Sequence, residues 1–149
     1  MNRLIDLIKH HEGTGPVKNG RLMPYQDSEG YTTIGYGRCI DLVGITEKEA
    51  DELVRNDIIQ TGAECYHNFF WFDEMNEPRQ AVIVSMVFNM GMPKFKGLDG
   101  HPGFKKTIKL LEGEHYVAAS IEMLDSKWAK QVGQRAIELS NMMKTGKWL

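Results

Sequence analysis

The first amphipathic segment of the chain is short and ends beside a charged residue. Four apolar residues recur at the three-to-four spacing of a helix, and Gly13 follows as a stop signal. The pattern predicts a helix over residues 3–12 with Glu12 in its last turn. The four apolar residues are Leu4, Ile5, Leu7 and Ile8.

The next segment alternates apolar and polar residues and is interrupted by turns. Residues 14–42 contain seven glycines or prolines, and turn sequences occur at Asn19-Gly20 and at residues 28–30. Tyr31, Thr33 and Ile34 lie between them in an alternating pattern. These features predict a small β meander.

Two longer helices are predicted after the meander. Thr46 and Glu49 form a capping-box pattern, in which each side chain satisfies the other's backbone amide, and this predicts a helix over residues 46–68. A second start, with Asn76 as cap and Pro78 in the first turn, precedes residues 81–88, which are apolar on every face. We expect this helix to be the buried centre of a helical lobe, ending at Gly91.

The remaining sequence predicts a loop and three short helices. Residues 91–103 are rich in glycine and proline, whereas residues 104–112, 116–124 and 133–144 show helical apolar spacing. The whole pattern predicts one α+β domain over residues 1–149. A β-containing lobe (about 13–45) is joined by a linking helix (about 46–68) to a helical lobe (about 69–149) that also packs with helix 3–12, leaving a groove between the lobes.

Composition and charge add limits to this picture. The 149 residues include 42% hydrophobic and 26% charged side chains, typical of a soluble globular protein, and no apolar run reaches the roughly 18 residues of a membrane span. Residues 79–149 carry 11 basic and 6 acidic groups, net +5, against net −7 for residues 1–78. The basic half either faces an anionic polymer or consists of solvated helix faces. Nucleic acid is a poor fit, because no dense basic run with interleaved aromatics is present.

The cysteines and histidines suggest no metal or redox centre. Cys39 and Cys65 lack a CxxC spacing, so free thiols are expected, with a structural disulfide as the alternative. The five histidines lack the spacing of metal ligands, and we expect no metal and no cofactor. Trp128, Trp148 and the aromatic run at residues 69–72 are expected to be packing anchors rather than sugar platforms.

The candidate chemistry rests on two carboxylates. Glycosidic cleavage needs a protonated carboxyl to donate to the leaving oxygen and an ionised carboxylate to stabilise the sugar cation or activate water. Glu12 and Asp27 are candidates for those tasks. Taken singly, each also fits a structural role, Glu12 as a solvated residue at a helix end and Asp27 as a turn cap.

The combination of motifs resembles the phage-type lysozymes, the endolysins related to the T-even phage enzyme. Three stretches carry the active-site resemblance: His11-Glu12-Gly13, Pro24-Tyr25-Gln26-Asp27, and the run from Tyr31 to Gly37. Later blocks at residues 76–81, 86–91, 128–136 and 145–148 extend it over nearly the whole chain. The resemblance implies a lysozyme-like α+β fold.

The resemblance also implies roles for individual residues. Glu12 would be the general acid, Asp27 the second carboxylate, and Thr33 the hydroxyl that helps to hold the attacking water. Inversion would require the carboxyl groups to lie roughly 6.5 to 9.5 Å apart. We expect Glu12 to be half-buried, hydrogen-bonded and oriented by Arg135.

Further positions match substrate contacts of the family. Phe88 fits the groove or the core equally well, and Asn89 fits a hydrogen bond to sugar or a helix cap; Cys39 and Glu122 differ from the usual residue types. The full set of implied substrate-binding residues is Phe88, Asn89, Phe104, Thr107, Cys39 and Glu122.

Two departures from the T-even enzyme stand out. The segment between Glu12 and Asp27 is longer, which changes the lower lip of the groove. Arg38 replaces a histidine, so an arginine ion pair could stand where a histidine pair would otherwise form.

The residues themselves support a two-carboxylate glycosidase with a groove, and the resemblance implies an endolysin, a muramidase hydrolysing the β-1,4 bond between N-acetylmuramic acid and N-acetylglucosamine in peptidoglycan. The resemblance implies a monomer that accumulates in the host cytoplasm, depends on a holin, does not insert in the membrane, and reaches the periplasm and a thin wall after permeabilisation. The alternatives are a lytic transglycosylase and a non-catalytic peptidoglycan-binding module.

Overall fold

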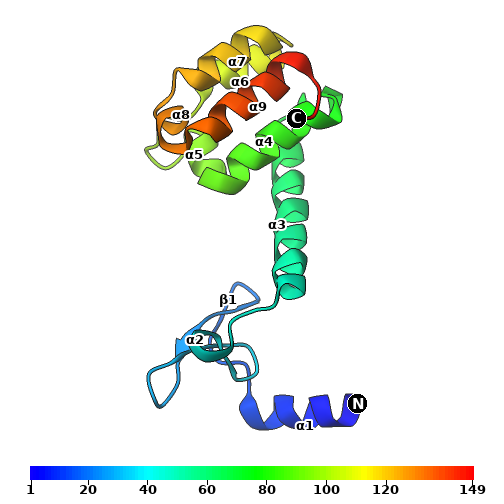
Figure 1. The fold of residues 1–149 in the computed structure, drawn as a ribbon, viewed down its shortest axis with the longest axis vertical. Helices are drawn as coiled ribbons and strands as arrows, with labels where there is room; N and C mark the ends of the chain where they lie inside the picture. Colours follow the sequence, from blue (N-terminus) through cyan, green and yellow to red (C-terminus); the bar gives the residue numbers. More distant parts are fainter. The chain divides into compact units, whose positions relative to one another are not determined.

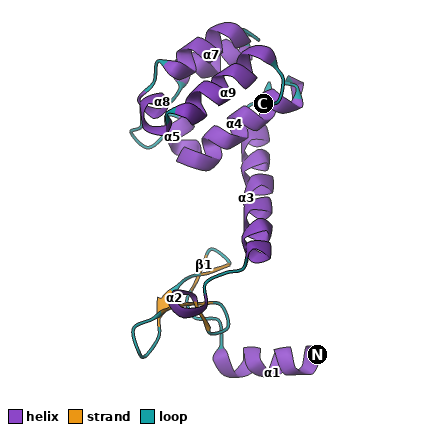
Figure 2. Cartoon of the chain, in the orientation of Figure 1, coloured by secondary structure: helices purple, strands orange, loops and turns teal.

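The computed structural model describes residues 1–149 and divides into two compact units, residues 1–52 and 53–149. All five strands belong to the N-terminal unit, and the C-terminal unit is helical (Figure 2). With nine α-helices and small antiparallel sheets, the predicted α+β class is confirmed. None of the helices combines the length and apolar character needed to cross a bilayer.

The N-terminal unit begins with helix α1 (Asn2–Glu12), which confirms the predicted helix over residues 3–12. It ends at Gly13, whose φ of 66° is left-handed and whose N–H donates to the Lys9 carbonyl. The apolar side chains of α1 are exposed. The expected packing of this helix with the helical lobe stays a prediction.

The predicted meander consists of two small antiparallel sheets. Strands β1 (Val17–Lys18) and β2 (Arg21–Leu22) form one sheet, and β3 (Tyr25–Gln26), β4 (Thr32–Ile34) and β5 (Arg38–Cys39) form the other in that order. A four-residue helix α2 (Ile40–Val43), which the sequence pattern did not predict, follows β5. The Thr32 N–H donates to the Asp41 carboxylate at 2.7 Å, so α2 is fastened to the middle strand.

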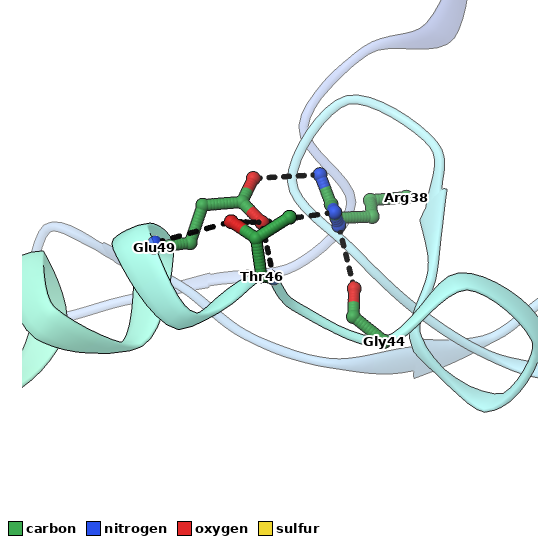
Figure 3. A network of polar contacts seen from close by, with 4 residues as sticks. All are labelled: Arg38, Gly44, Thr46 and Glu49. Carbon is green, nitrogen blue, oxygen red and sulfur yellow. Dashed lines mark hydrogen bonds and ion pairs between the residues drawn. The ribbon is translucent and has the colours of Figure 1, made fainter.

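A polar network joins β5 to the start of helix α3, which begins at Glu47 (Figure 3). The Arg38 guanidinium donates to both carboxylate oxygens of Glu49, at 2.8 and 3.0 Å, and to the Gly44 carbonyl. The capping box is confirmed: the Thr46 N–H donates to Glu49, and the Glu49 N–H donates to the Thr46 hydroxyl. Arg38 therefore forms the ion pair that its replacement of a histidine suggested, and a bidentate pair fixes direction as well as distance.

Helix α3 (Glu47–Asn68) confirms the predicted helix over residues 46–68, and only Cys65 is buried along it. A 3₁₀ turn, η1 (Phe72–Glu74), and α4 (Glu77–Met90) follow. The later helices are α5 (Met92–Lys96), α6 (Lys105–Glu112), α7 (Tyr116–Leu124), α8 (Lys127–Val132) and α9 (Gln134–Thr145). The prediction of three short helices was incomplete, because α5 lies within the expected loop at residues 91–103 and α8 was missed. Both span at most six residues, too few to show an amphipathic period.

The core of the C-terminal unit lies around α4, beside which α9 runs, with α7 packed on α9 (Figure 1). Val82, Ile83, Met86 and Val87 of α4 are at most 2% exposed. Phe88, which the sequence left open between groove and core, is 45% exposed. Although α4 is apolar on all sides, one of its faces lines an open groove.

Two polar side chains near the start of α4 fasten the end of α9. The Arg79 guanidinium donates to the Met143 carbonyl at 2.9 Å and lies over the Tyr116 ring. Asn76 is the N-cap residue of α4, but its side chain does not cap that helix and instead donates to the Gly146 carbonyl at 2.8 Å. These bonds satisfy carbonyls at a helix C-terminus, which lack partners within the helix.

The aromatic residues follow the expected packing role only in part. Phe69, Trp71, Phe72 and Trp128 are buried, as predicted for packing anchors. Phe70 and Trp148 are 76% and 57% exposed, so that prediction was wrong for these two. The alternation of buried and exposed rings at residues 69–71 shows that the run turns its middle member outward.

Cys39 and Cys65 are both free thiols, as predicted. Burial raises the pKa of the Cys65 thiol to about 12. Since the thiolate is the reactive form, Cys65 is expected to resist alkylation in the folded protein.

We expect iodoacetamide at pH 8 to modify Cys39, which is half-buried, and to spare Cys65 until the protein is unfolded. Intact-mass measurement before and after addition of guanidinium checks this. Modification of both thiols in the folded protein would contradict the assigned burial.

The Arg38–Glu49 network predicts a pH-dependent stability. Hydrogen bonds from Thr46, with a smaller contribution from the Arg38 charge, hold the pKa of the Glu49 carboxyl below its ordinary value. A lowered folded-state pKa stabilises the fold above the unfolded-state pKa, and that contribution is lost as the pH falls through the folded-state pKa.

Glu49→Gln is therefore expected to lower the thermal midpoint at pH 7, with the difference from wild type shrinking as the pH is taken below 4. Thermal unfolding monitored by circular dichroism from pH 3 to 7 measures it. Glu52→Gln on the same helix is the matched control and is expected to have little effect. An equal loss at every pH would contradict the ionic role.

Candidate active site

Glu12 is positioned by the end of α1 and by a glycine in the turn after β4. A Cβ atom placed on Gly37 would lie 2.9 Å from Glu12 Oε2 and 3.6 Å from its Cγ, so the Glu12 side chain lies against the bare backbone of Gly37. Gly37 also has a φ of 81°, which favours glycine. The helix end and the turn together determine where the carboxyl lies.

A second contact joins α1 to the same turn. The Lys9 ammonium lies over the Tyr36 ring, 5.0 Å from its centroid. Within the N-terminal unit the Glu12 side chain is exposed and makes no hydrogen bond, and the expectation of a half-buried, hydrogen-bonded group stays a prediction. Arg135, its expected partner, belongs to the C-terminal unit and is exposed there, so its orienting role stays a prediction.

Asp27 follows β3 and closes the turn into β4. Its Oδ1 accepts the N–H groups of Glu29 and Tyr31, both at 2.9 Å, and its own backbone pairs with Tyr31 and Gly30. The turn-capping role considered from the sequence is therefore present. Oδ2 has no protein partner, so one carboxylate oxygen is fixed by the backbone and the other remains available to a water or substrate.

Thr33 lies in the middle strand of the same sheet. Its register pairs it with Tyr25 on β3 and Cys39 on β5, and it is 4% exposed. The hydroxyl donates to the Tyr31 carbonyl at 3.3 Å, which leaves its lone pairs to accept from another donor. Cys39, expected to contact substrate, is half-buried beside Thr33 in the sheet.

The three predicted catalytic residues therefore belong to one unit and one short stretch of sheet. Asp27 precedes the β3–β4 turn, Thr33 lies on β4, and Glu12 rests on the turn between β4 and β5. Two carboxylates and a hydroxyl supported in this way can supply a proton and activate a water. No group of three His, Cys, Asp or Glu side chains is placed to hold a metal ion.

A second cluster of expected contacts lies in the C-terminal unit. Phe104, Thr107 and Glu122 line one groove with a volume of about 410 Å³, together with Trp128. The Phe104 and Trp128 rings meet edge to face with centroids 6.0 Å apart. The structure thus brings together three of the six residues expected to bind substrate.

Asn89 does not line this groove but is hydrogen-bonded to Trp128, which does, and it does not act as a helix cap. The Trp128 indole N–H donates to Asn89 Oδ1 at 3.1 Å, which leaves the amide NH₂ of Asn89 available as a donor. Trp128 is therefore both a packing anchor and a lining residue, a combination that the sequence analysis missed.

Glu122 is paired, which the sequence did not reveal. Its carboxylate accepts a hydrogen bond from Lys106, and this bond raises the pKa of the Lys106 ammonium. Lys106 is 74% exposed at the groove and is a functional candidate that sequence reasoning missed. No sequence signal could have found it, because residues 16 positions apart on two helices meet only through tertiary packing.

Phe88 does not join these residues. It lines a separate apolar groove of about 710 Å³ formed by α3, α4 and Trp148, all within the C-terminal unit. Phe88 therefore lines a groove rather than the core. This groove is distinct from the one that Phe104 and Thr107 line.

Comparison with known proteins identifies related sequences along the whole chain. The family model described as phage lysozyme matches residues 9–144. Two relatives from Dictyostelium discoideum are called probable T4-type lysozyme 1 and probable T4-type lysozyme 2. The first is 25% identical, with 95% of this chain and 93% of the relative covered, and the second is 24% identical, with 98% and 96% covered.

The contact between Glu12 and Gly37 predicts a positional effect on activity. Gly37→Ala is expected to reduce clearance of a bacterial wall suspension by roughly tenfold, because the new Cβ would lie 2.9 Å from Glu12 Oε2 and the carboxyl must move away from it. It should also lower the free energy of unfolding by roughly 1–2 kcal/mol through its left-handed φ.

Gly20→Ala is the control, since Gly20 has a φ of 73° but nothing within 4 Å of an added Cβ. It should share the loss of stability and retain the activity. Equal activity of the two variants would show that the close approach of Glu12 to Gly37 is unimportant.

Proposed function

The chain belongs to the phage lysozyme family, and from this premise we propose that it is a muramidase cleaving the β-1,4 bond between N-acetylmuramic acid and N-acetylglucosamine. Family membership supports a muramidase-type peptidoglycan hydrolase, a glycosidase whose substrate is bacterial peptidoglycan. The bond cleaved and the roles of individual residues belong to the proposal.

The observation that supports the proposal most strongly is the state of Asp27. A turn cap alone needs one oxygen, and here Oδ1 accepts two backbone N–H groups while Oδ2 has no protein partner. A carboxylate fixed in this way keeps its direction without a second side chain. In the proposed reaction Oδ2 accepts a proton from the attacking water, and Thr33 helps to hold that water.

Glu12 is the proton donor in this scheme. Its proton passes to the glycosidic oxygen as the bond to the sugar C1 breaks, and the water oxygen bonds to C1 from the opposite face. Configuration at C1 is thereby inverted, and the free hydroxyl stays on muramic acid. One proton leaves Glu12 and one enters Asp27, so exchange with solvent restores both groups.

The C-terminal groove supplies candidate sugar contacts. Phe104 and Trp128 offer apolar surface, and the Lys106–Glu122 pair offers charge at the rim. Grooves with apolar walls and a few fixed polar groups are typical of ligand sites. We propose that this groove binds sugars of the polymer.

The biological setting is part of the same proposal. We propose a monomeric phage endolysin that waits in the host cytoplasm until a holin opens the membrane and then lyses the cell from the periplasm. The motifs shared with phage-type enzymes support this, whereas the Dictyostelium relatives show that proteins named for this type of lysozyme also occur outside phages.

Glu12→Gln is expected to retain the fold and to lower the rate of peptidoglycan hydrolysis by roughly 10² to 10⁴, the usual contribution of a general acid. Glu52→Gln, which makes the same chemical change on an exposed helix position, is the control. Mass spectrometry of soluble fragments released from purified peptidoglycan gives the rate and identifies the products, and an active Glu12→Gln would overturn the assignment.

The product ends separate the alternatives. Reducing muramic acid ends from the wild type support the hydrolase. Anhydro ends, with activity retained in Asp27→Asn, would identify a lytic transglycosylase, which needs no second carboxylate. Release of no fragments by the wild type would identify a binding module.

A further inference from the structure

A third groove in the C-terminal unit is neither acidic nor part of the candidate sugar groove. It has a volume of about 460 Å³ and lies between the segment that follows α3 and the helix α6. Phe69 and Trp71 contribute stacked rings with centroids 4.9 Å apart, and the Asn68 amide and three lysines also line it. Glu112 is the only acidic residue among those that line it.

Phe70 is the most unusual feature of this groove. It is 76% exposed, whereas the adjacent Phe69 and Trp71 are 3% and 4% exposed. Backbone hydrogen bonds from Phe69 to Cys65 and from Phe72 to Phe69 fix this segment, so Phe70 is held outward rather than left without structure. A large aromatic ring kept in water loses the free energy that burial would provide, and beside the lysines of this groove it offers apolar surface to a ligand.

The lysines give the groove a positive charge in a defined arrangement. Lys105 and Lys109 lie one turn apart on α6 and are in no salt bridge. Lys96 is directed by a hydrogen bond to the Asn68 amide oxygen at 2.9 Å and lies near the Phe69 ring. Three ammonium groups beside an exposed ring form a site for a ligand that is flat, partly apolar and anionic.

The groove adjoins the candidate sugar groove at Lys105, which lines both. Behind the two grooves, ring contacts run through the core from Phe69 through Phe95 to Phe104 and Trp128, and Phe95 is 0% exposed.

We propose that the groove beside Phe70 is an accessory binding site for peptidoglycan, in which the Phe70 ring packs against the apolar face of a sugar and the lysines bind carboxylates of the stem peptides. The identity of the polymer rests on the proposed function, while the charge and shape of the groove do not. The site holds the enzyme on the strand that it cleaves.

A strand occupant accounts for the features better than an anionic membrane does. A membrane surface is flat and requires no groove. A sugar strand uses the ring face and the charges of the groove together.

Adsorption to insoluble peptidoglycan tests the site without catalysis. In a Glu12→Gln background, the fraction that sediments with purified peptidoglycan is measured as a function of polymer concentration. Adding Phe70→Ser and Lys109→Gln is expected to weaken adsorption by roughly tenfold, the loss typical of one anchoring contact. The controls are Ile121→Ser, at an apolar position that is 65% exposed, and Lys147→Gln, at an exposed lysine.

The outcomes are distinct from those of the activity assay. Adsorption that depends on Phe70, with a wild type that cleaves nothing, would support this site and refute the muramidase. Unchanged adsorption of Phe70→Ser with Lys109→Gln, at an unchanged thermal midpoint, would overturn the site even if hydrolysis is confirmed. Binding to phosphatidylglycerol vesicles that depends on Phe70, without binding to peptidoglycan, would overturn it in favour of a membrane surface.

Discussion

The burial of α4 is the constraint on which the C-terminal unit depends. The helices around it are short, and isolated helices of fewer than about 12 to 15 residues are marginal in water. Val82, Ile83 and Met86 are fully buried, and each buried side chain of this size contributes roughly 1.5–3 kcal/mol. The last turn of α9 is fastened to the start of α4 by Arg79 and Asn76, so the longest-range contacts of the unit also return to α4.

The N-terminal unit is organised differently. Thr33 is the only buried residue among residues 1–52, so this unit has polar connections in place of a large apolar core. Carboxylates provide most of these connections: Asp27 closes one turn, Asp41 fastens α2 to β4, and Glu49 joins α3 to Arg38. Of the residues proposed for catalysis, Asp27 and Thr33 are thus held by hydrogen bonds within this unit.

This division has a consequence for the chemistry. Asp27 is at once a structural turn cap and the proposed base, because its two oxygens have different surroundings. Glu12 has no comparable bond and is positioned by shape, through the bare backbone of Gly37. Hydrogen bonds therefore hold the orientation of the Asp27 carboxylate, whereas that of Glu12 is held less firmly. This difference is expected for one group that holds a water and another that must reach a leaving oxygen. In the C-terminal unit, by contrast, aromatic rings and lysines line the grooves.

The sequence by itself determined the elements whose signals are local. Helical spacing, the Thr46–Glu49 capping box and the glycines that end α1 and α4 located six helices and the β region, since such signals act over a few residues. The motif around Glu12, Asp27 and Thr33 indicated the candidate site for the same reason. Only the tertiary structure decided that Phe70, Phe88 and Trp148 face outward, that α5 and α8 are helical, and that Arg38 pairs with Glu49 and Lys106 with Glu122. Exposure and ion pairing depend on what other segments bring to a position, and no local pattern of apolar and polar residues contains that information.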